Sequence, residues 1–222
     1  MPRVLITGAG RGIGLEIARQ YAADGWEVVA TVREPGKARE LAAPGVRVEA
    51  LDMRDFAALA AFPERLGGEP LDLFIANAGI SKAKWVRSRE DAEAWQEVHA
   101  VNAVAPTLLA EALLPLVEAA GGRMAAISSR MGSIADSSGG YIGYRASKAA
   151  LNAAWRALAL GWRERKVTLV LLHPGWVRTD MGGPQAPLPA QESVAGMRRV
   201  IAGLPRSQSG AFVDYRGDPV PW

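Results

Sequence analysis

The chain has 222 residues, of which 49% are hydrophobic and 22% are charged, and its formal net charge is +3. This balance is typical of a globular protein with a sizeable core. Lysine and arginine are spread along the chain without a basic run, so neither nucleic acid nor a membrane is expected as a partner. The absence of cysteine excludes disulfides, thiolate nucleophiles and zinc–thiolate sites.

Two further absences narrow the class of protein. No group of histidines and carboxylates has metal-ligand spacing, so no metal is expected. No apolar run approaches the ~20 residues of a membrane span, and no secretory signal precedes the first strand pattern. These features predict a cytoplasmic protein.

Apolar strand patterns and helical patterns alternate along the chain. The segments predicted as strands are residues 4–7, 27–32, 47–51, 71–76, 123–128, 168–173 and 211–214. The segments predicted as helices are residues 13–23, 35–42, 56–66 behind an Asp55 cap, 92–119, 144–163 and 193–202. Pro106 and Pro115 are expected to disturb the long helix. The alternation predicts one domain over residues 1–222, a doubly wound parallel sheet (Rossmann fold) of about seven strands with helices on both faces.

A glycine-rich turn joins the first strand to the first helix, where residues 7–14 read TGAGRGIG. Glycines let the backbone approach a phosphate closely, and the helix start offers free N–H groups and a positive dipole end. The alternative is a tight turn without a ligand. The residues predicted to hold a dinucleotide here are Thr7, Gly8, Gly10, Arg11, Gly12, Ile13 and Gly14.

The end of the second strand indicates which dinucleotide is bound. NAD-binding members of this fold carry a carboxylate there for the ribose hydroxyls. In this chain Val32 and Arg33 occupy that place, and Arg33 together with Arg11 offers two guanidinium groups to a 2′-phosphate. We therefore expect NADP(H). NAD(H) is the alternative if both arginines point away from the ribose.

Two more strand ends contribute to the expected cofactor site. Asp52 follows the third strand beside Met53, and its carboxylate is a candidate partner for the adenine amino group. Asn77, Ala78 and Gly79 follow the fourth strand, where small side chains let the chain pass close to the ribose. Turn or capping chemistry explains these residues equally well.

A phenol and an ammonium group are expected on one helix face, because Tyr144 and Lys148 are four residues apart. An ammonium group and an oxidised nicotinamide both favour the phenolate, whose reference pKa is ~10. Tyr144 is then the predicted general acid and base, and Ser129, at the end of the fifth strand, the hydroxyl that holds the carbonyl oxygen. His173 has no partner for triad chemistry and is expected to be a satisfied structural histidine.

In order and spacing, these motifs resemble the short-chain dehydrogenase/reductase family over nearly the whole chain. The matching positions are TGxxxGxG at residues 7–14, Asn77-Ala78-Gly79, Asn102, Ile127-Ser128-Ser129, Tyr144 with Lys148, and Pro174-Gly175. The resemblance implies that Asn102 relays protons through water to Lys148, and that Lys148 also binds the nicotinamide ribose. It further implies that Pro174, Gly175, Trp176 and Val177 line the nicotinamide and that Thr179 holds its carboxamide or a phosphate. A homodimer or homotetramer is implied as well.

Within the family, residues 129–134, 144–148, 173–183 and 219–222 are similar to C-factor-like and sniffer-like carbonyl reductases. Residues 180–192 are expected to form a short substrate loop. The residues predicted to line the substrate pocket are Arg130, Met131, Tyr141, Trp176 and Met181, with Ile134 and Trp85 as further candidates.

The function predicted from the sequence is NADP(H)-dependent transfer of hydride to or from a small carbonyl or alcohol substrate. Two alternatives stay open: an NAD-preferring dehydrogenase, and a cofactor-binding regulator with little turnover. The presence of Asn102, Ser129, Tyr144 and Lys148 together favours turnover, because a pure binder does not need that set.

Overall fold

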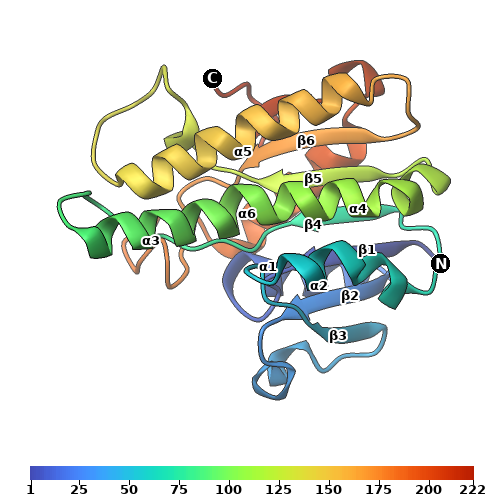
Figure 1. Ribbon diagram of the computed structural model, residues 1–222. Coiled ribbons are helices and arrows are strands. Elements are labelled where there is room, and N and C mark those ends of the chain that lie inside the picture. The colour runs from blue at the N-terminus through green and yellow to red at the C-terminus, as the bar shows by residue number, and fades with distance from the viewer.

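The computed structural model describes residues 1–222 and contains one sheet of seven strands (Figure 1). The strands are β1 Arg3–Thr7, β2 Glu27–Val32, β3 Val46–Ala50, β4 Leu73–Ala76, β5 Arg123–Ile127, β6 Thr168–His173 and β7 Ala211–Asp214. Their order is β3-β2-β1-β4-β5-β6-β7, and every neighbouring pair is parallel. The predicted doubly wound sheet is confirmed.

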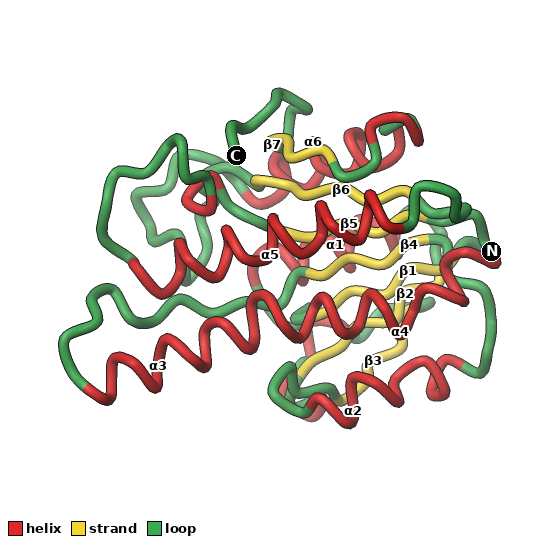
Figure 2. The backbone as a smooth tube through the Cα atoms, turned by 45° about the horizontal axis from the view of Figure 1, so that its top comes forward, coloured by secondary structure: helices red, strands yellow, loops and turns green.

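Helices cover both faces of this sheet. They are α1 Gly12–Ala23, α2 Phe56–Ala61, α3 Arg89–His99, α4 Ala105–Ala119, α5 Ile142–Gly161 and α6 Ala190–Gly203. Helices α2, α4 and α5 lie on one face and α1 and α6 on the other (Figures 1 and 2). Two buried hydrophobic clusters fill the two layers, and β1 shows the reason: Leu5 points into one cluster, whereas Val4 and Ile6 point into the other.

The long helix predicted over residues 92–119 is interrupted, but not where the prolines suggested. It begins at Arg89, behind a Ser88 side chain that accepts a hydrogen bond from the Asp91 N–H, and widens into a π-helical turn at Ala100–Val104. Pro106 directly follows this turn at the start of α4, and α4 continues through Pro115 to Ala119. On length and composition the stretch Arg89–Ala119 could cross a membrane, but 56% of its most apolar window is buried inside the fold. It is therefore packed as a core helix.

Other predicted boundaries moved by a few residues. Residues 35–42 form two short 3₁₀ turns, Pro35–Lys37 and Arg39–Leu41, rather than one helix. Asp55 caps α2 as predicted, by accepting from the Ala58 N–H at 2.9 Å. Helix α2 ends at Ala61 because Pro63 has no N–H to continue the ladder, and a 3₁₀ turn, Phe62–Leu66, follows. Helix α6 begins at Ala190, three residues earlier than expected.

The sheet changes direction between β1 and β4. The chain moves outward from β1 to β2 and β3, and then crosses back to β4 on the other side of β1. In such sheets, loops leave the carboxyl ends of these two central strands on opposite sides and open a crevice. The topology therefore places a binding site where residues 7–14 and residues 77–80 leave β1 and β4.

Candidate active site

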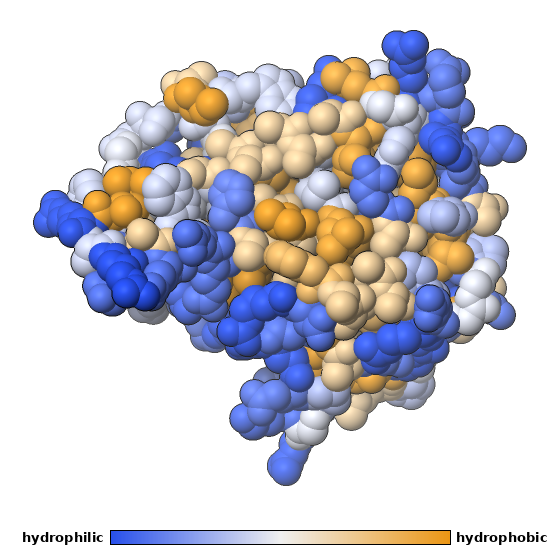
Figure 3. All heavy atoms as spheres, viewed as in Figure 1, coloured by the Kyte–Doolittle hydropathy of each residue, from blue (hydrophilic) through white to orange (hydrophobic).

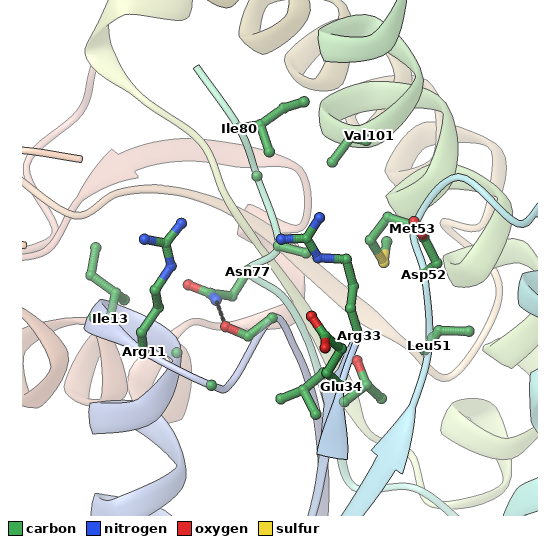
Figure 4. A pocket seen from close by; sticks show the side chains of 18 of the residues that line it. Arg11, Ile13, Arg33, Glu34, Leu51, Asp52, Met53, Asn77, Ile80 and Val101 are labelled. Carbon is green, nitrogen blue, oxygen red and sulfur yellow. Dashed lines mark hydrogen bonds between the residues drawn. The ribbon is translucent and has the colours of Figure 1, made fainter. Parts of the chain in front are cut away.

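A cleft of about 480 Å³ lies at this crevice. Its wall includes residues that follow β1, β2, β3 and β4 and residues from the loop after β6 (Figure 4). It brings together most of the predicted cofactor residues: Gly8, Gly10, Arg11, Gly12, Ile13, Gly14, Val32, Arg33, Asp52, Met53, Asn77, Ala78, Gly79 and Thr179.

The glycine loop is shaped by close backbone approach. Gly8 has a positive φ of 67°, a conformation that costs other residues strain. A Cβ on Gly14 would come within 2.5 Å of the Asn77 side-chain nitrogen. That nitrogen donates to the carbonyl oxygens of Thr7 and Gly8 at 2.9 and 3.1 Å, so Asn77 joins the end of β4 to the glycine loop (Figure 4).

The residues present fit a dinucleotide phosphate. Helix α1 starts at this loop with no side-chain cap on its N–H groups and no acidic residue in its first turn. An uncapped helix start carries a positive dipole end and free donors, which favour an anion. The buried Thr31 hydroxyl, at the end of β2 in the same wall, also makes no hydrogen bond within the chain. The cleft wall thus offers unpaired hydrogen-bond donors at the positions where this fold binds the phosphate and ribose of a dinucleotide.

The two arginines predicted to hold a 2′-phosphate differ in their surroundings. Both reach toward the cleft (Figure 4). Arg11 pairs with Asp180 at 2.7 Å, which links the glycine loop to the loop after β6. Arg33 has no carboxylate partner, and Asp52 accepts from the Nε and Nη2 of Arg54 at 2.6 to 3.2 Å. Arg33 is therefore the arginine of the cleft that an incoming phosphate can pair with directly.

Lys148 is buried on α5 and reaches back to the sheet. Its ammonium donates to the backbone oxygen of Ile127, at the end of β5, at 2.7 Å. Burial lowers the pKa of Lys148 to about 8. Gly79 connects this group to the cleft, because a Cβ on Gly79 would stand 3.7 Å from the Lys148 nitrogen and 3.4 Å from the Asn102 oxygen.

Tyr144 lies one helical turn before Lys148, with the ammonium 5.8 Å from the centre of its ring. Burial raises the pKa of Tyr144, and a hydrogen bond with Ser129 opposes that rise. The sequence predicted that the ammonium group would lower the Tyr144 pKa. In the cofactor-free structure burial and Ser129 account for the shift of the Tyr144 pKa, and the Lys148 ammonium donates to Ile127, so a lowering of that pKa by Lys148 stays a prediction.

Ser129 follows β5 and begins a short 3₁₀ turn, Arg130–Gly132, which packs against α5. Its side chain accepts from the Met131 N–H at 3.1 Å and is buried. Gly132 lets this turn touch the helix, because a Cβ there would stand 2.8 Å from the Lys148 backbone. Ser129, Tyr144 and Lys148 are thus brought together by direct packing of α5 on the end of β5.

Asn102 lies in the π-helical turn and is fully buried. Its amide oxygen accepts from the Ile80 N–H at 2.9 Å, and its nitrogen donates to the Ile80 oxygen at 2.8 Å and to the Ser147 hydroxyl at 3.0 Å. The side chain therefore links the loop after β4 to α5. The proton relay implied for Asn102 stays a prediction.

Some predicted residues do not line the cleft. Trp176 is exposed and donates its indole N–H to the Gly182 oxygen at 2.8 Å, which braces the loop after β6. Gly175 faces Leu188, and the Pro174 oxygen accepts from Ser193 at 2.6 Å. Val177 is buried. The structure also corrects the interpretation of His173: its buried Nδ1 has no hydrogen-bond partner, so it is not a satisfied histidine.

Sequence reasoning missed part of the cleft wall. The additional lining residues are Thr31, Glu34, Lys37, Ala38, Leu51, Arg54, Ile80, Glu97, Val101 and Asp180. Thr31, Leu51 and Ile80 adjoin predicted strand ends, and Asp180 lies in the predicted substrate loop, so these four could have been inferred. Glu97 could not, because it reaches the cleft from α3, whose position depends on the assembled fold.

Comparison with known proteins agrees with this geometry. A family model described as short chain dehydrogenase matches residues 2–188. The C-signal protein of Myxococcus xanthus is 45% identical over 166 residues, which is 74% of this chain and all of that protein. Among solved structures, NADPH-bound carbonyl reductase from chicken fatty liver is 37% identical, with a TM-score of 0.90 and coverage of 100% of this chain and 99% of that chain.

Carbonyl reductase Sniffer of D. melanogaster is similar in its full length. It is 32% identical, with a TM-score of 0.90, and each chain covers 100% of the other. Family match, sequence identity and fold agree with the catalytic and glycine motifs described above. This chain belongs to the short-chain dehydrogenase/reductase family.

Proposed function

We propose that this protein is an NADP(H)-dependent oxidoreductase that reduces a small carbonyl compound to an alcohol. The observation that carries the proposal is the meeting of Ser129, Tyr144 and Lys148 beside Gly79, at the edge of a cleft with an uncapped helix start and an unpaired Arg33. Relatives of the same fold include carbonyl reductases with NADPH bound. Bound NADPH supplies the hydride.

The residues of the chain supply orientation and the proton. In this proposal the Ser129 hydroxyl holds the carbonyl oxygen, and the Tyr144 phenol gives that oxygen a proton. Because burial raises the pKa of Tyr144, the phenol is protonated at neutral pH, which suits reduction. With a pKa of about 8, Lys148 is a cation at pH 7 and stabilises the phenolate left after proton transfer.

The cofactor preference follows from the charges of the cleft. The free Arg33 guanidinium is the proposed ligand of the 2′-phosphate, whereas Arg11 must first exchange its Asp180 partner. Loss of a charged hydrogen bond costs about 1.5–3 kcal/mol, or about ten- to a hundredfold in affinity. Arg33→Ala should therefore weaken NADPH binding by that factor and leave NADH binding nearly unchanged. An equal loss for both cofactors would contradict this role.

The reaction is tested by kinetics with Tyr144→Phe. We expect wild-type protein to consume NADPH with an aromatic aldehyde, and the variant to lose at least about a hundredfold in kcat while binding NADPH as before. Unchanged turnover in the variant would refute the mechanism. Tight NADPH binding without turnover in the wild type would favour the alternative of a nucleotide-dependent regulator.

Two finer expectations remain proposals. Residues 180–192 are proposed to act as the substrate loop, because Met181 lines the cleft and Asp180 reaches Arg11 across it. A homo-oligomer is proposed through the helical face of α4 and α5, where Val104, just before α4, and Leu160 of α5 are exposed. In Figure 3 pale and orange residues spread over this face, whereas blue residues gather along its lower edge. Sedimentation velocity tests this assembly.

A further inference from the structure

The connection from β4 to α3 contains a short basic and aromatic segment, residues 82–87, which read KAKWVR and which we call the basic loop. Its backbone is fixed to the start of α5: the Gly143 N–H donates to the Ala83 oxygen at 3.0 Å and the Ile142 N–H to the Lys84 oxygen at 3.3 Å. A Cβ on Gly143 would stand only 2.9 Å from the Ala83 Cβ. The basic loop thus lies against the residue that precedes Tyr144.

Figure 1 shows this arrangement at one end of the molecule, where the starts of α3 and α5 lie together. The same end holds the carboxyl ends of the strands and the loop that contains Trp176 (Figures 1 and 2). The basic loop is therefore part of the rim around the proposed reaction site.

Two aromatic rings on this rim each have a cation over them. The Lys84 ammonium is 5.2 Å from the centre of the Tyr141 ring, and the Arg87 guanidinium is 5.2 Å from the centre of the Trp85 ring. Tyr141 and Trp85 are 44% and 45% exposed. The rim thus presents apolar ring surface and positive charge side by side.

The charges of the basic loop differ in their partners. Lys82 is paired with Glu97. Lys84 and Arg87 make no ion pair in the chain. This holds for Arg87 even though the first turn of α3, just after it, contains Glu90 and Asp91. Arg130, next to Ser129, stands 3.6 Å from Asp136, which is too long for a hydrogen bond. Two cations therefore remain free for an anion, and a third is held only weakly.

The backbone at this rim is strained where the cation and ring meet. Ala83 and Tyr141 are the only residues other than glycine with a positive φ, 53° and 52°. Such strain persists only where the surrounding structure fixes it, and it gathers at ligand sites. Here it sets the position of Tyr141 at the start of α5, three residues before Tyr144, and brings its ring under Lys84.

We propose that the substrate is a carbonyl compound that carries an anionic group, which Lys84 and Arg87 bind while the rings of Tyr141 and Trp85 contact its apolar body. This inference rests on the proposed function, because it names the substrate class of the same site. It assigns a role in substrate selection to the basic loop, which lies outside the cofactor cleft and outside the catalytic set.

The test compares two ligands that differ in one charge: 4-carboxybenzaldehyde, which is an anion at pH 7, and its neutral methyl ester, methyl 4-formylbenzoate. Binding is measured first, by isothermal titration calorimetry with NADP⁺ present, for wild type, Lys84→Gln and the double variant Lys84→Gln/Arg87→Gln. Arg199→Gln, an exposed arginine of α6 without an ion pair, is the matched control. Thermal unfolding confirms that each variant is folded.

We expect the wild type to bind the carboxylate about tenfold more tightly than the ester, and the double variant to lose that preference while its affinity for the ester is unchanged. Raising the salt concentration should reduce the wild-type preference. The control should behave as the wild type. Equal wild-type affinity for the two ligands, or an equal loss of both ligands in the double variant, would overturn the inference.

Turnover separates this inference from the proposed function. If the wild type reduces both aldehydes with NADPH at the same kcat/KM and the variants do not change it, the substrate class is wrong and the function stands. If neither aldehyde is reduced although the carboxylate binds and depends on Lys84, the anion site stands and the proposed function fails.

Discussion

The buried Lys148 should destabilise the cofactor-free protein at neutral pH. The pKa of Lys148 is about 8 in the fold and ~10.4 in an unfolded chain, and one pKa unit corresponds to about 1.4 kcal/mol. Below pH 8 both states hold the proton, and the folded state bears the whole penalty of about 3 kcal/mol. Between pH 8 and 10.5 the unfolded chain holds more protons than the folded one, so stability rises with pH in that window.

The variant Lys148→Met removes this proton linkage. Its lost hydrogen bond to Ile127 and its altered packing contribute terms that do not depend on pH. The difference in unfolding free energy between Lys148→Met and wild type should therefore shift by about 2 kcal/mol in favour of the wild type between pH 7 and 9.5. Stopping at pH 9.5 keeps the measurement below the range in which Tyr144 ionises.

Equilibrium urea unfolding at half-unit pH steps measures this difference without any cofactor. Lys166→Met is the control, because Lys166 is an exposed lysine and its difference from wild type should stay constant across the series. A constant difference for Lys148→Met as well would refute the reasoning, since it would mean that the buried ammonium is not penalised by the fold.

Three further predictions follow from polar groups inside the fold. Asn77→Ala removes the two bonds to the Thr7 and Gly8 oxygens and should lower the free energy of unfolding by about 1–3 kcal/mol, measured by urea unfolding. An unchanged free energy of unfolding would contradict the role of Asn77 as a link. Asn152→Leu leaves the buried Ser128 hydroxyl without its acceptor on α5, and should lower kcat with aldehydes while the KM for NADPH stays the same; an unchanged kcat would show that this bond does not position Ser129. His173, whose pKa burial lowers to about 4, is neutral in the fold but charged in the unfolded chain below pH 6.5, so stability should fall from pH 6.5 to 4 and fall less in His173→Gln; equal slopes would refute this.

The sequence predicted the sheet because short apolar segments rich in β-branched residues alternate with helical patterns, and each of the seven predicted segments overlaps a strand. It located the glycine loop because the tight turn and the close backbone approach depend on glycines that all lie within residues 7–14. It missed the π-helical turn at Ala100–Val104 because no residue type marks such a turn, and the three bonds that hold Asn102 come from Ile80 and Ser147, distant in the chain.

Electrostatic detail was the least predictable part of the site. Arg11 and Arg33 looked equivalent in the sequence, yet only the folded loop after β6 brings Asp180 to Arg11. The coupling of Lys148 to Tyr144 was inferred from a spacing of four residues, but the ammonium group of the free chain is directed to Ile127 by the packing of α5 on β5. Burial, which no local pattern reports, determines the pKa of both groups.

Transfer of deuterium tests the central claim most directly. Wild-type protein is mixed with an aromatic aldehyde and NADPH carrying deuterium at one of the two positions of nicotinamide C4, and the alcohol is analysed by mass spectrometry. We predict that deuterium appears on the carbinol carbon from one of the two labelled forms and not from the other. Absence of labelled alcohol from both forms, in a protein that binds NADPH, would contradict the account.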